Sequence, residues 1–311
     1  MTDQTEFDYN EAFSRNIGWV SLSEQQEIRQ KRVAIAGLGG VGGGHFLALT
    51  RLGVERFHVA DLDQFDLANM NRQAGCGMSA LGQEKVHSMV KQALDINPNL
   101  YVERFDRGVC EANIDAFLQD VDVVVDGLDL YAPKVRRLLF AKAYEKKIPL
   151  VTAGPLGAGT AYLVFDEHSP HPDRYFDFND THSDMELLVH FLVGLAPKAL
   201  QSSYIAAPQH VSPLQGKVCS LSAGSYLATG VLVAKVFQLL LGRGQIRSAP
   251  HYQQYDALRN QFVHGRLRWG NRSPWQSLKI RLVMRAFKKM QAQYVPLPHS
   301  QAHTVVTAKR A

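Results

Sequence analysis

Cysteine is scarce in this chain of 311 residues, with thiols only at Cys76, Cys110 and Cys219 and no CxxC pair. An odd number of separated cysteines excludes a disulfide scaffold and offers no zinc framework, and it is typical of a reducing compartment such as the cytoplasm. A long apolar run is missing too. The most apolar stretch, 220–241, is interrupted by Lys235, which leaves about 16 uninterrupted residues where a bilayer requires ~20. We therefore expect a buried helix there and no transmembrane segment.

Acidic residues are absent after Asp256, although eleven cations follow it. Since the formal net charge is +5, residues 1–256 carry −6 and the basic character belongs to the C-terminal part. The remaining composition, with 46% hydrophobic and 20% charged residues, is that of an ordinary globular protein. The polar, acidic start MTDQTEFDYNEAF argues against a secretory signal.

Short apolar runs alternate with helical patterns along the first half of the chain. Strands are expected at 32–36, 56–60, 101–107, 120–129 and 149–154, with helices between them, and parallel neighbours need such crossover connections. Later segments are a strand at 159–165, a polar loop, helices at 185–195 and 216–242, and antiparallel strands at 251–257 and 260–269. The pattern predicts an α/β, Rossmann-like, doubly wound, mostly parallel sheet with a C-terminal antiparallel extension.

Four parts of the chain follow from this pattern. Residues 1–30 are expected to form an N-terminal helical arm, and 31–165 a nucleotide-binding core. Residues 166–265 supply a crossover loop, the long apolar helix and the closing strands of the same domain, and 266–311 a basic amphipathic helix, at 274–290, with a polar tail. The basic helix could lie on an anionic membrane or bind an acidic partner, but packing on the protein is the favoured interpretation, and no nucleic-acid partner is expected.

A glycine turn joins the first strand to the first helix, and its glycines are Gly37, Gly39, Gly40 and Gly42. Glycines allow the backbone to approach a phosphate, and the helix N-terminus offers unpaired N–H groups. Asp61 ends the second strand, where a carboxylate can accept hydrogen bonds from ribose hydroxyls. These features fit NAD and ATP equally well.

A polar cluster follows the second strand and favours a triphosphate. It comprises Asp61, Asp63, Asn69, Asn71, Arg72 and Gln73, with Lys85 twelve residues further on. A dehydrogenase needs no such group of cations beside its pyrophosphate, whereas an enzyme that expels pyrophosphate does. Asp126 and Asp129 follow a central strand, at the sheet edge where ligands bind, and a carboxylate there can hold Mg²⁺.

This combination of motifs resembles the adenylation domain of the ThiF/MoeB/HesA family, the bacterial relatives of ubiquitin-activating enzymes, over roughly residues 10–165. The resemblance implies that Asp61 binds ribose, that Asp129 holds magnesium, and that phosphate contacts come from Asn69, Arg72, Gln73 and Lys85. It also implies a homodimer in which Arg15 reaches the phosphates of the partner's site. The implied reaction uses ATP and Mg²⁺ to convert the C-terminal carboxylate of a small acceptor protein or peptide into an acyl adenylate.

The sequence departs from the family pattern in several places. Gly43, Leu130 and Lys134 stand where relatives often carry other residues, and the crossover loop, expected at 166–200, contains no cysteine. Cys219 and Cys76 are weak candidates for a nucleophile, and the His- and Asp-rich stretch 166–184 is a weak candidate for a metal site. A catalytically silent relative and an NAD(P)-binding oxidoreductase therefore stay open as alternatives.

Overall fold

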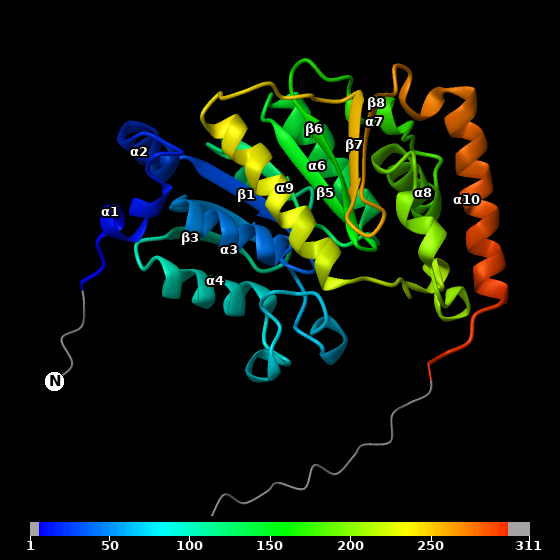
Figure 1. Cartoon of the computed structure of the whole chain (residues 1–311), viewed down its shortest axis with the longest axis horizontal. Helices are drawn as coiled ribbons and strands as arrows, with labels where there is room; N and C mark the ends of the chain where they lie inside the picture. The colour runs from blue at the N-terminus through cyan, green and yellow to red at the C-terminus, as the bar shows by residue number, and fades with distance from the viewer. Residues whose placement is uncertain (1–5, 298–311) are drawn as a thin grey trace, which may run out of the picture.

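Eight strands form one sheet in the computed structural model, which describes residues 6–297. Their spatial order is β3-β2-β1-β4-β5-β6-β7-β8 (Figure 1). Strands β1 to β5 run parallel to one another, and β6, β7 and β8 pair antiparallel. Their bounds are Arg32–Ala36, Arg56–Ala60, Tyr101–Phe105, Val123–Asp126, Leu150–Leu156, Gly159–Phe165, His251–Asp256 and Gln261–Arg266 for β1 to β8. The predicted fold class is confirmed.

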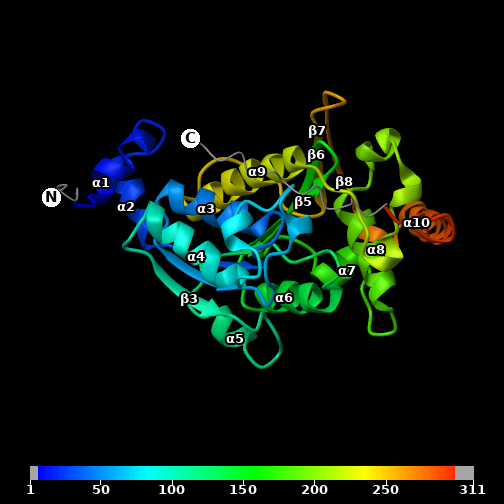
Figure 2. The same cartoon turned by 90° about the horizontal axis from the view of Figure 1, so that it is seen from below.

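Helices cover both faces of the sheet, giving three layers (Figure 2). One core contains side chains of α3, α4 and α9, and the other contains side chains of α5, α6, α7 and α8. Successive side chains of β1 explain the two cores, because Val33 and Ile35 enter the first while Ala34 and Ala36 enter the second. Bounds of these helices are Gly42–Leu52 (α3), Lys85–Ile96 (α4), Ile114–Phe117 (α5), Pro133–Glu145 (α6), Pro172–Phe176 (α7), Asp184–Leu195 (α8) and Ser222–Leu240 (α9).

Helices α1 (Tyr9–Ala12) and α2 (Leu22–Gln30) form an arm at the far end of α3 from the glycine turn. The hydroxyl of Tyr9 donates to the carbonyl of Gly53 at 2.7 Å, and the amide of Gln25 donates to the carbonyl of Leu52 at 3.1 Å. These carbonyls end α3, where a helix leaves acceptors without intrahelical partners. The arm therefore caps α3.

Helix α9 differs from its prediction in start and burial. It begins at Ser222, because the chain turns at Gly216 with φ +72° and pairs Lys217 with Ser212 instead of continuing as helix. Among residues 6–297 it is the one helix long and apolar enough to span a membrane, with mean hydropathy of 1.4. It packs on β5, β6 and α3 along one side, while Tyr226 on the other side is 68% exposed. The expectation of a buried helix is thus half right.

The segment predicted as the crossover loop is partly helical. Residues 166–200 contain the two helices α7 and α8, whereas the irregular connection runs from 196 to 221, with short 3₁₀ turns at Leu200–Tyr204, Pro208–His210 and Pro213–Gln215. Cys219 lies in this connection and is exposed. Residues 166–200 contain no cysteine, and the irregular connection that follows α8 contains Cys219.

His45 of α3 is buried in the core, with no exposed surface and no hydrogen-bond partner for either ring nitrogen among the described residues. Desolvation by burial lowers its pKa from 6.5 to about 3. The unfolded chain takes up a proton near pH 6.5 and the folded chain does not. The unfolded state therefore binds more protons below pH 6.5, and the free energy of unfolding falls as the pH falls through this window.

We expect this group to remove about 2 kcal/mol of unfolding free energy between pH 6.5 and pH 5, since one pH unit is worth about 1.4 kcal/mol. The variant His45→Leu should show a flatter pH dependence by that amount. Urea unfolding of both proteins at the two pH values measures the difference. An identical pH dependence would show that His45 gains a partner or becomes exposed.

Candidate functional site

The glycine turn has the tight geometry that a phosphate-binding turn requires. Gly37 adopts φ +89°, a conformation that favours glycine. A Cβ atom on Gly42 would collide with the carbonyl oxygen of Gly37, and one on Gly37 would collide with Gly127. The start of α3 is thereby pressed against the ends of β1 and β4, with its N-terminal N–H groups at the carboxyl edge of the sheet. This is the edge where open α/β sheets bind ligands.

Asp61 joins the second strand to this turn. Its carboxylate accepts hydrogen bonds from the backbone N–H of Leu38 at 2.6 Å and of Asp63 at 2.9 Å. Burial raises the pKa of Asp61, and the Leu38 N–H and the Lys85 ammonium oppose that rise. Because each carboxylate oxygen has a second lone pair, Asp61 retains acceptor capacity for a ribose hydroxyl.

Three side chains of the predicted phosphate set gather at the glycine turn. A Cβ atom on Gly39 would lie 3.7 Å from Nε2 of Gln73 and 3.9 Å from Nζ of Lys85. One on Gly40 would lie 3.8 Å from Nε of Arg72. The chain segment after β2 therefore folds back over the turn and brings two cations and an amide to one point.

Lys85 and Gln73 are the buried members of this set. Lys85 is 5% exposed and its ammonium contacts the Asp63 carboxylate at 2.9 Å. Gln73 is 7% exposed, and its Oε1 has no hydrogen-bond partner among the described residues. A buried, unpaired amide oxygen is costly, and a donor on a bound ligand would satisfy it.

Asn69 and Arg72 are positioned by the backbone of the same segment. The side chain of Asn69 accepts from the N–H of Asp66 at 3.0 Å, which closes a 3₁₀ turn at Leu67–Asn69. Arg72 donates to the carbonyl of Ala68 at 2.8 Å and to Oδ1 of Asn71 at 2.9 Å. Asn69 shapes the loop in this structure, while the Arg72 guanidinium lies beside Gly40.

Asp126 and Asp129, which sequence reasoning treated together, have different environments. Asp126 is 3% exposed and accepts hydrogen bonds from Arg136 at 2.9 Å and from Thr152 at 2.8 Å. Asp129 is exposed, and one of its oxygens accepts the N–H of Tyr131 at 2.8 Å. Asp126 is therefore a structural residue, and Asp129 is the carboxylate available to a ligand.

Magnesium fits Asp129 by the chemistry of the donors. Among residues 6–297 no group of three or more His, Cys, Asp or Glu residues could hold a metal. Mg²⁺ needs no such group, since it is usually bound through one or two carboxylates together with substrate phosphates and water.

Arg136 is a residue that the sequence analysis missed. Besides pairing with Asp126, it donates to the carbonyl of Leu128 at 2.7 Å and to that of Asp129 at 3.2 Å, so it holds the loop that carries the exposed carboxylate. A signal was present in the spacing of α6. Pro133, Arg136 and Phe140 recur three and four residues apart, which places the cation on the buried face of the helix.

Arg15 lies away from the other predicted site residues of its own chain. It belongs to a 3₁₀ turn, Ser14–Asn16, and Asn16 donates to the carbonyl of Leu52 at 3.1 Å. The glycine turn stands at the opposite end of α3, about 16 Å away along a helix of 1.5 Å rise per residue. Within one chain Arg15 therefore makes no contact with the turn.

Cys219 lies next to a residue that contacts the polar cluster, because the side chain of Asn71 donates a hydrogen bond to the carbonyl of Ser220 at 2.9 Å. Cys76 is a poorer nucleophile, since burial above all raises the pKa of its thiol.

We expect Cys219→Ser to leave adenylation within about two-fold of the wild type, because a carboxylate that attacks ATP needs no thiol. Pyrophosphate exchange measures adenylation alone, and release of activated product to an acceptor measures the later step. Loss of exchange in this variant would mean that the thiol takes part in activation.

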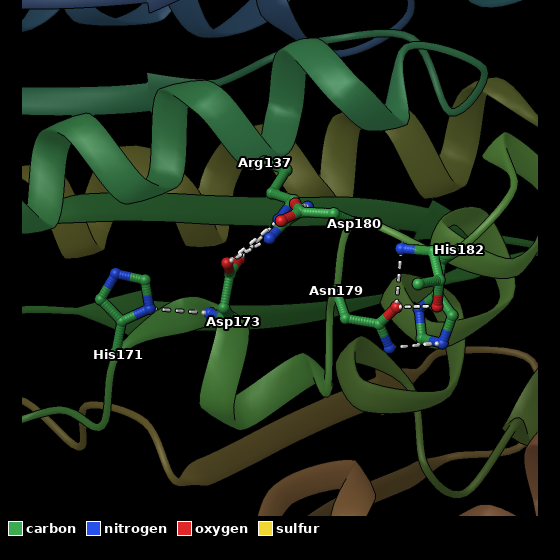
Figure 3. Close-up of polar contacts among 7 residues, drawn as sticks. Arg137, His171, Asp173, Asn179, Asp180 and His182 are labelled. Atoms are coloured by element: carbon green, nitrogen blue, oxygen red, sulfur yellow. Dashed lines mark hydrogen bonds and ion pairs between the residues drawn. The ribbon is translucent and has the colours of Figure 1, made fainter.

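The His- and Asp-rich stretch 166–184 is held by ion pairs (Figure 3). Arg137 of α6 contacts both oxygens of Asp173, at 3.1 and 3.0 Å from Nε, and Asp180 at 2.7 Å. The rings of His182 and His190 are tilted by 51° to each other, with centroids 4.4 Å apart. Asp173 and Asp180 are therefore occupied by a cation of the protein, which weakens the candidacy of this stretch as a metal site.

The fold and the turn define a Rossmann-like α/β protein with a glycine-rich strand–helix junction. The sequence model of the ThiF family matches residues 13–274, and the chain belongs to this family.

Two curated relatives illustrate the range within the family. The tRNA threonylcarbamoyladenosine dehydratase of Bacillus subtilis is 31% identical over 173 residues, which cover 55% of this chain and 64% of the relative. The molybdopterin-synthase adenylyltransferase of Escherichia coli is 30% identical over 148 residues, covering 48% and 59%. The matches thus span about three fifths of each relative.

Solved structures share the fold at low sequence identity. PaaA has a TM-score of 0.63 at 19% identity, covering 86% of this chain and 78% of PaaA. Escherichia coli MccB, solved with ATP, has a TM-score of 0.63 at 13% identity, covering 86% and 75%. These likenesses support the architecture.

Proposed function

We propose that the protein is an ATP-dependent adenylyltransferase that activates the C-terminal carboxylate of a small protein or peptide as an acyl adenylate and releases pyrophosphate. The convergence of Arg72, Gln73 and Lys85 on Gly39 and Gly40 carries this proposal. It sets two cations beside a helix N-terminus, which is an environment for a triphosphate.

Charge neutralisation is the main task of the site, because one anion attacks another. Lys85 leaves Asp63 or shares its proton donors with the phosphates, and Arg72 contacts the phosphates over Gly40. Asp61 accepts from the ribose. Mg²⁺ held by Asp129 would supply further positive charge at the phosphates. A general base is unnecessary, since the attacking carboxylate is ionised, and the protein contributes orientation and electrostatic stabilisation.

A homodimer would complete this site. Helix α9 exposes Tyr226, and the adjoining arm exposes Trp19, 84% accessible, whose carbonyl accepts from Arg243 after α9. Exposed apolar side chains on neighbouring elements are typical of an interface. We propose that a second copy covers this surface and that its Arg15 reaches the phosphates.

We also propose that the protein acts in the cytoplasm.

A second candidate acceptor is favoured by the relative named tRNA threonylcarbamoyladenosine dehydratase. In that case the activated carboxylate belongs to a modified tRNA nucleoside, contrary to the expectation of no nucleic-acid partner. ATP-dependent activation makes a carboxylate oxygen a leaving group, which is the chemistry that a dehydration requires.

Pyrophosphate exchange into ATP tests activation. Mg-ATP should also raise the free energy of unfolding, by about 2.7 kcal/mol at one hundred times its Kd, while NADH should not. Exchange that depends on peptides with a free C-terminus supports the first acceptor, and exchange that depends on modified tRNA supports the second. Mg-ATP binding without exchange for either acceptor points to a silent relative, and stabilisation by NADH alone points to an oxidoreductase.

A further inference from the structure

Helix α10 (Pro274–Ala292) is the outermost element on one side of the molecule, beyond α8 (Figures 1 and 2). Its inner side packs on α8 through Ile280, Val283, Met284 and Phe287. The apolar requirement of an amphipathic helix is therefore met on that side. The outer side is covered by no other element of the described chain.

Hydrogen bonds at both ends hold α10 in one orientation. Gln276 is 1% exposed and donates to the carbonyl of Val193 at 3.2 Å. Near the other end, Ser212 donates to the side chain of Gln291 at 2.8 Å. The same residues of α10 consequently always face outward.

The outward side carries large apolar side chains. Trp275 is 76% exposed, Leu278 40% and Leu282 50%. They follow one another at intervals of three and four residues, so they share one flank of the helix. An exposed row of this kind on a fixed helix is a contact surface and not scattered exposure.

Cations occupy the rest of that side. Arg281, Arg285, Lys288 and Lys289 are exposed, and no carboxylate of residues 6–297 lies within 4.0 Å of them. Other cations of the chain do pair, as Arg137 does with Asp173 and Asp180. Since no acidic residue follows Asp256, the sequence supplies no local counter-charge.

We propose that the outer side of α10 binds the surface of an anionic lipid bilayer. The four cations contact anionic headgroups, while Trp275, Leu278 and Leu282 enter the boundary between headgroups and acyl chains. Charge complementarity alone would suit any polyanion. The row of exposed apolar side chains favours the bilayer, because a soluble polyanion leaves these side chains in water.

Co-sedimentation of the full chain with vesicles tests the proposal. We expect binding to vesicles of phosphatidylcholine with roughly one third phosphatidylglycerol, and at least ten-fold weaker binding to phosphatidylcholine alone or at high salt. Replacing Arg285→Gln and Lys289→Gln should weaken binding about 25-fold, since each cation near an anionic surface contributes about five-fold.

The control replaces two exposed cations elsewhere, Arg51→Gln with Lys91→Gln, and should bind as the wild type does. Thermal unfolding verifies that every variant is folded. Equal binding to neutral and anionic vesicles, or an equal loss in the control, would overturn the proposal.

Tryptophan fluorescence separates a bilayer from a soluble polyanion. The emission should shift to the blue on anionic vesicles, and Trp275→Phe should lose most of that shift while still binding. Leu278→Gln with Leu282→Gln should weaken binding. Binding to single-stranded RNA or polyglutamate through Arg285 and Lys289, with no sedimentation on anionic vesicles, would assign the surface to another partner and overturn the proposal.

Discussion

Replacing Asp129→Asn should lower Mg²⁺-dependent pyrophosphate exchange by at least about 100-fold, since a metal at the reacting phosphate contributes several kcal/mol and 1.36 kcal/mol is ten-fold in rate. The amide keeps the size of the side chain and its acceptor for the Tyr131 N–H, so the fold should persist. Exchange measured over a range of Mg²⁺ concentrations tests this, with ATP binding followed separately.

The matched control for this variant is Asp95→Asn, an exposed carboxylate on α4. It should retain wild-type exchange. Asp126→Asn is unsuitable, because removing the charge that faces the buried Arg136 would destabilise the fold itself. Unchanged exchange and unchanged magnesium dependence in Asp129→Asn would remove this residue from the metal role.

Mixing chains of Arg15→Ala with chains of Asp129→Asn should restore about a quarter of wild-type exchange, although each variant alone is inactive. In a two-fold symmetric dimer, half of the molecules are then mixed, and one of the two sites in each has both residues intact. The structure supplies the reason to expect this, because Arg15 lies at the opposite end of α3 from its own glycine turn.

A second mixture makes the complementation test specific. Asp129→Asn combined with Lys85→Ala should stay inactive, since both side chains serve the site of their own chain. Restoration in this control would mean exchange of whole segments between chains. A confirmed mixed dimer of Arg15→Ala and Asp129→Asn without activity would contradict a contribution across the interface.

The strands and the glycine turn could be predicted because the local amino-acid pattern determines them. RVAIA before GLGGVGGG is a buried strand entering a turn, and the structure has β1 at Arg32–Ala36 with Gly37 at positive φ. The turn glycines are required by contacts that no larger residue permits. Such features depend on neighbours along the chain and on one adjacent strand.

The start of α9 could not be predicted, because apolar content does not mark a helix boundary. Val218 and Leu221 continue the apolar pattern backwards from the helix, and Leu221 at the N-cap makes no side-chain capping hydrogen bond. Pairing of Lys217 with Ser212 sets the extended conformation there. That pairing closes a tight turn at Gly216, and Cys219 follows it in the irregular connection that leads to α9.

Residue types and their spacing were enough to indicate the family, the glycine turn and the set Arg72, Gln73 and Lys85, since these reside in short motifs. Tertiary structure alone decided which carboxylate is exposed and which is paired with Arg136, because that depends on packing between β4 and α6. It also decided that Arg15 lies far from its own turn and that the cations of α10 face outward. Distances between segments remote in sequence are set by the folded core and not by local pattern.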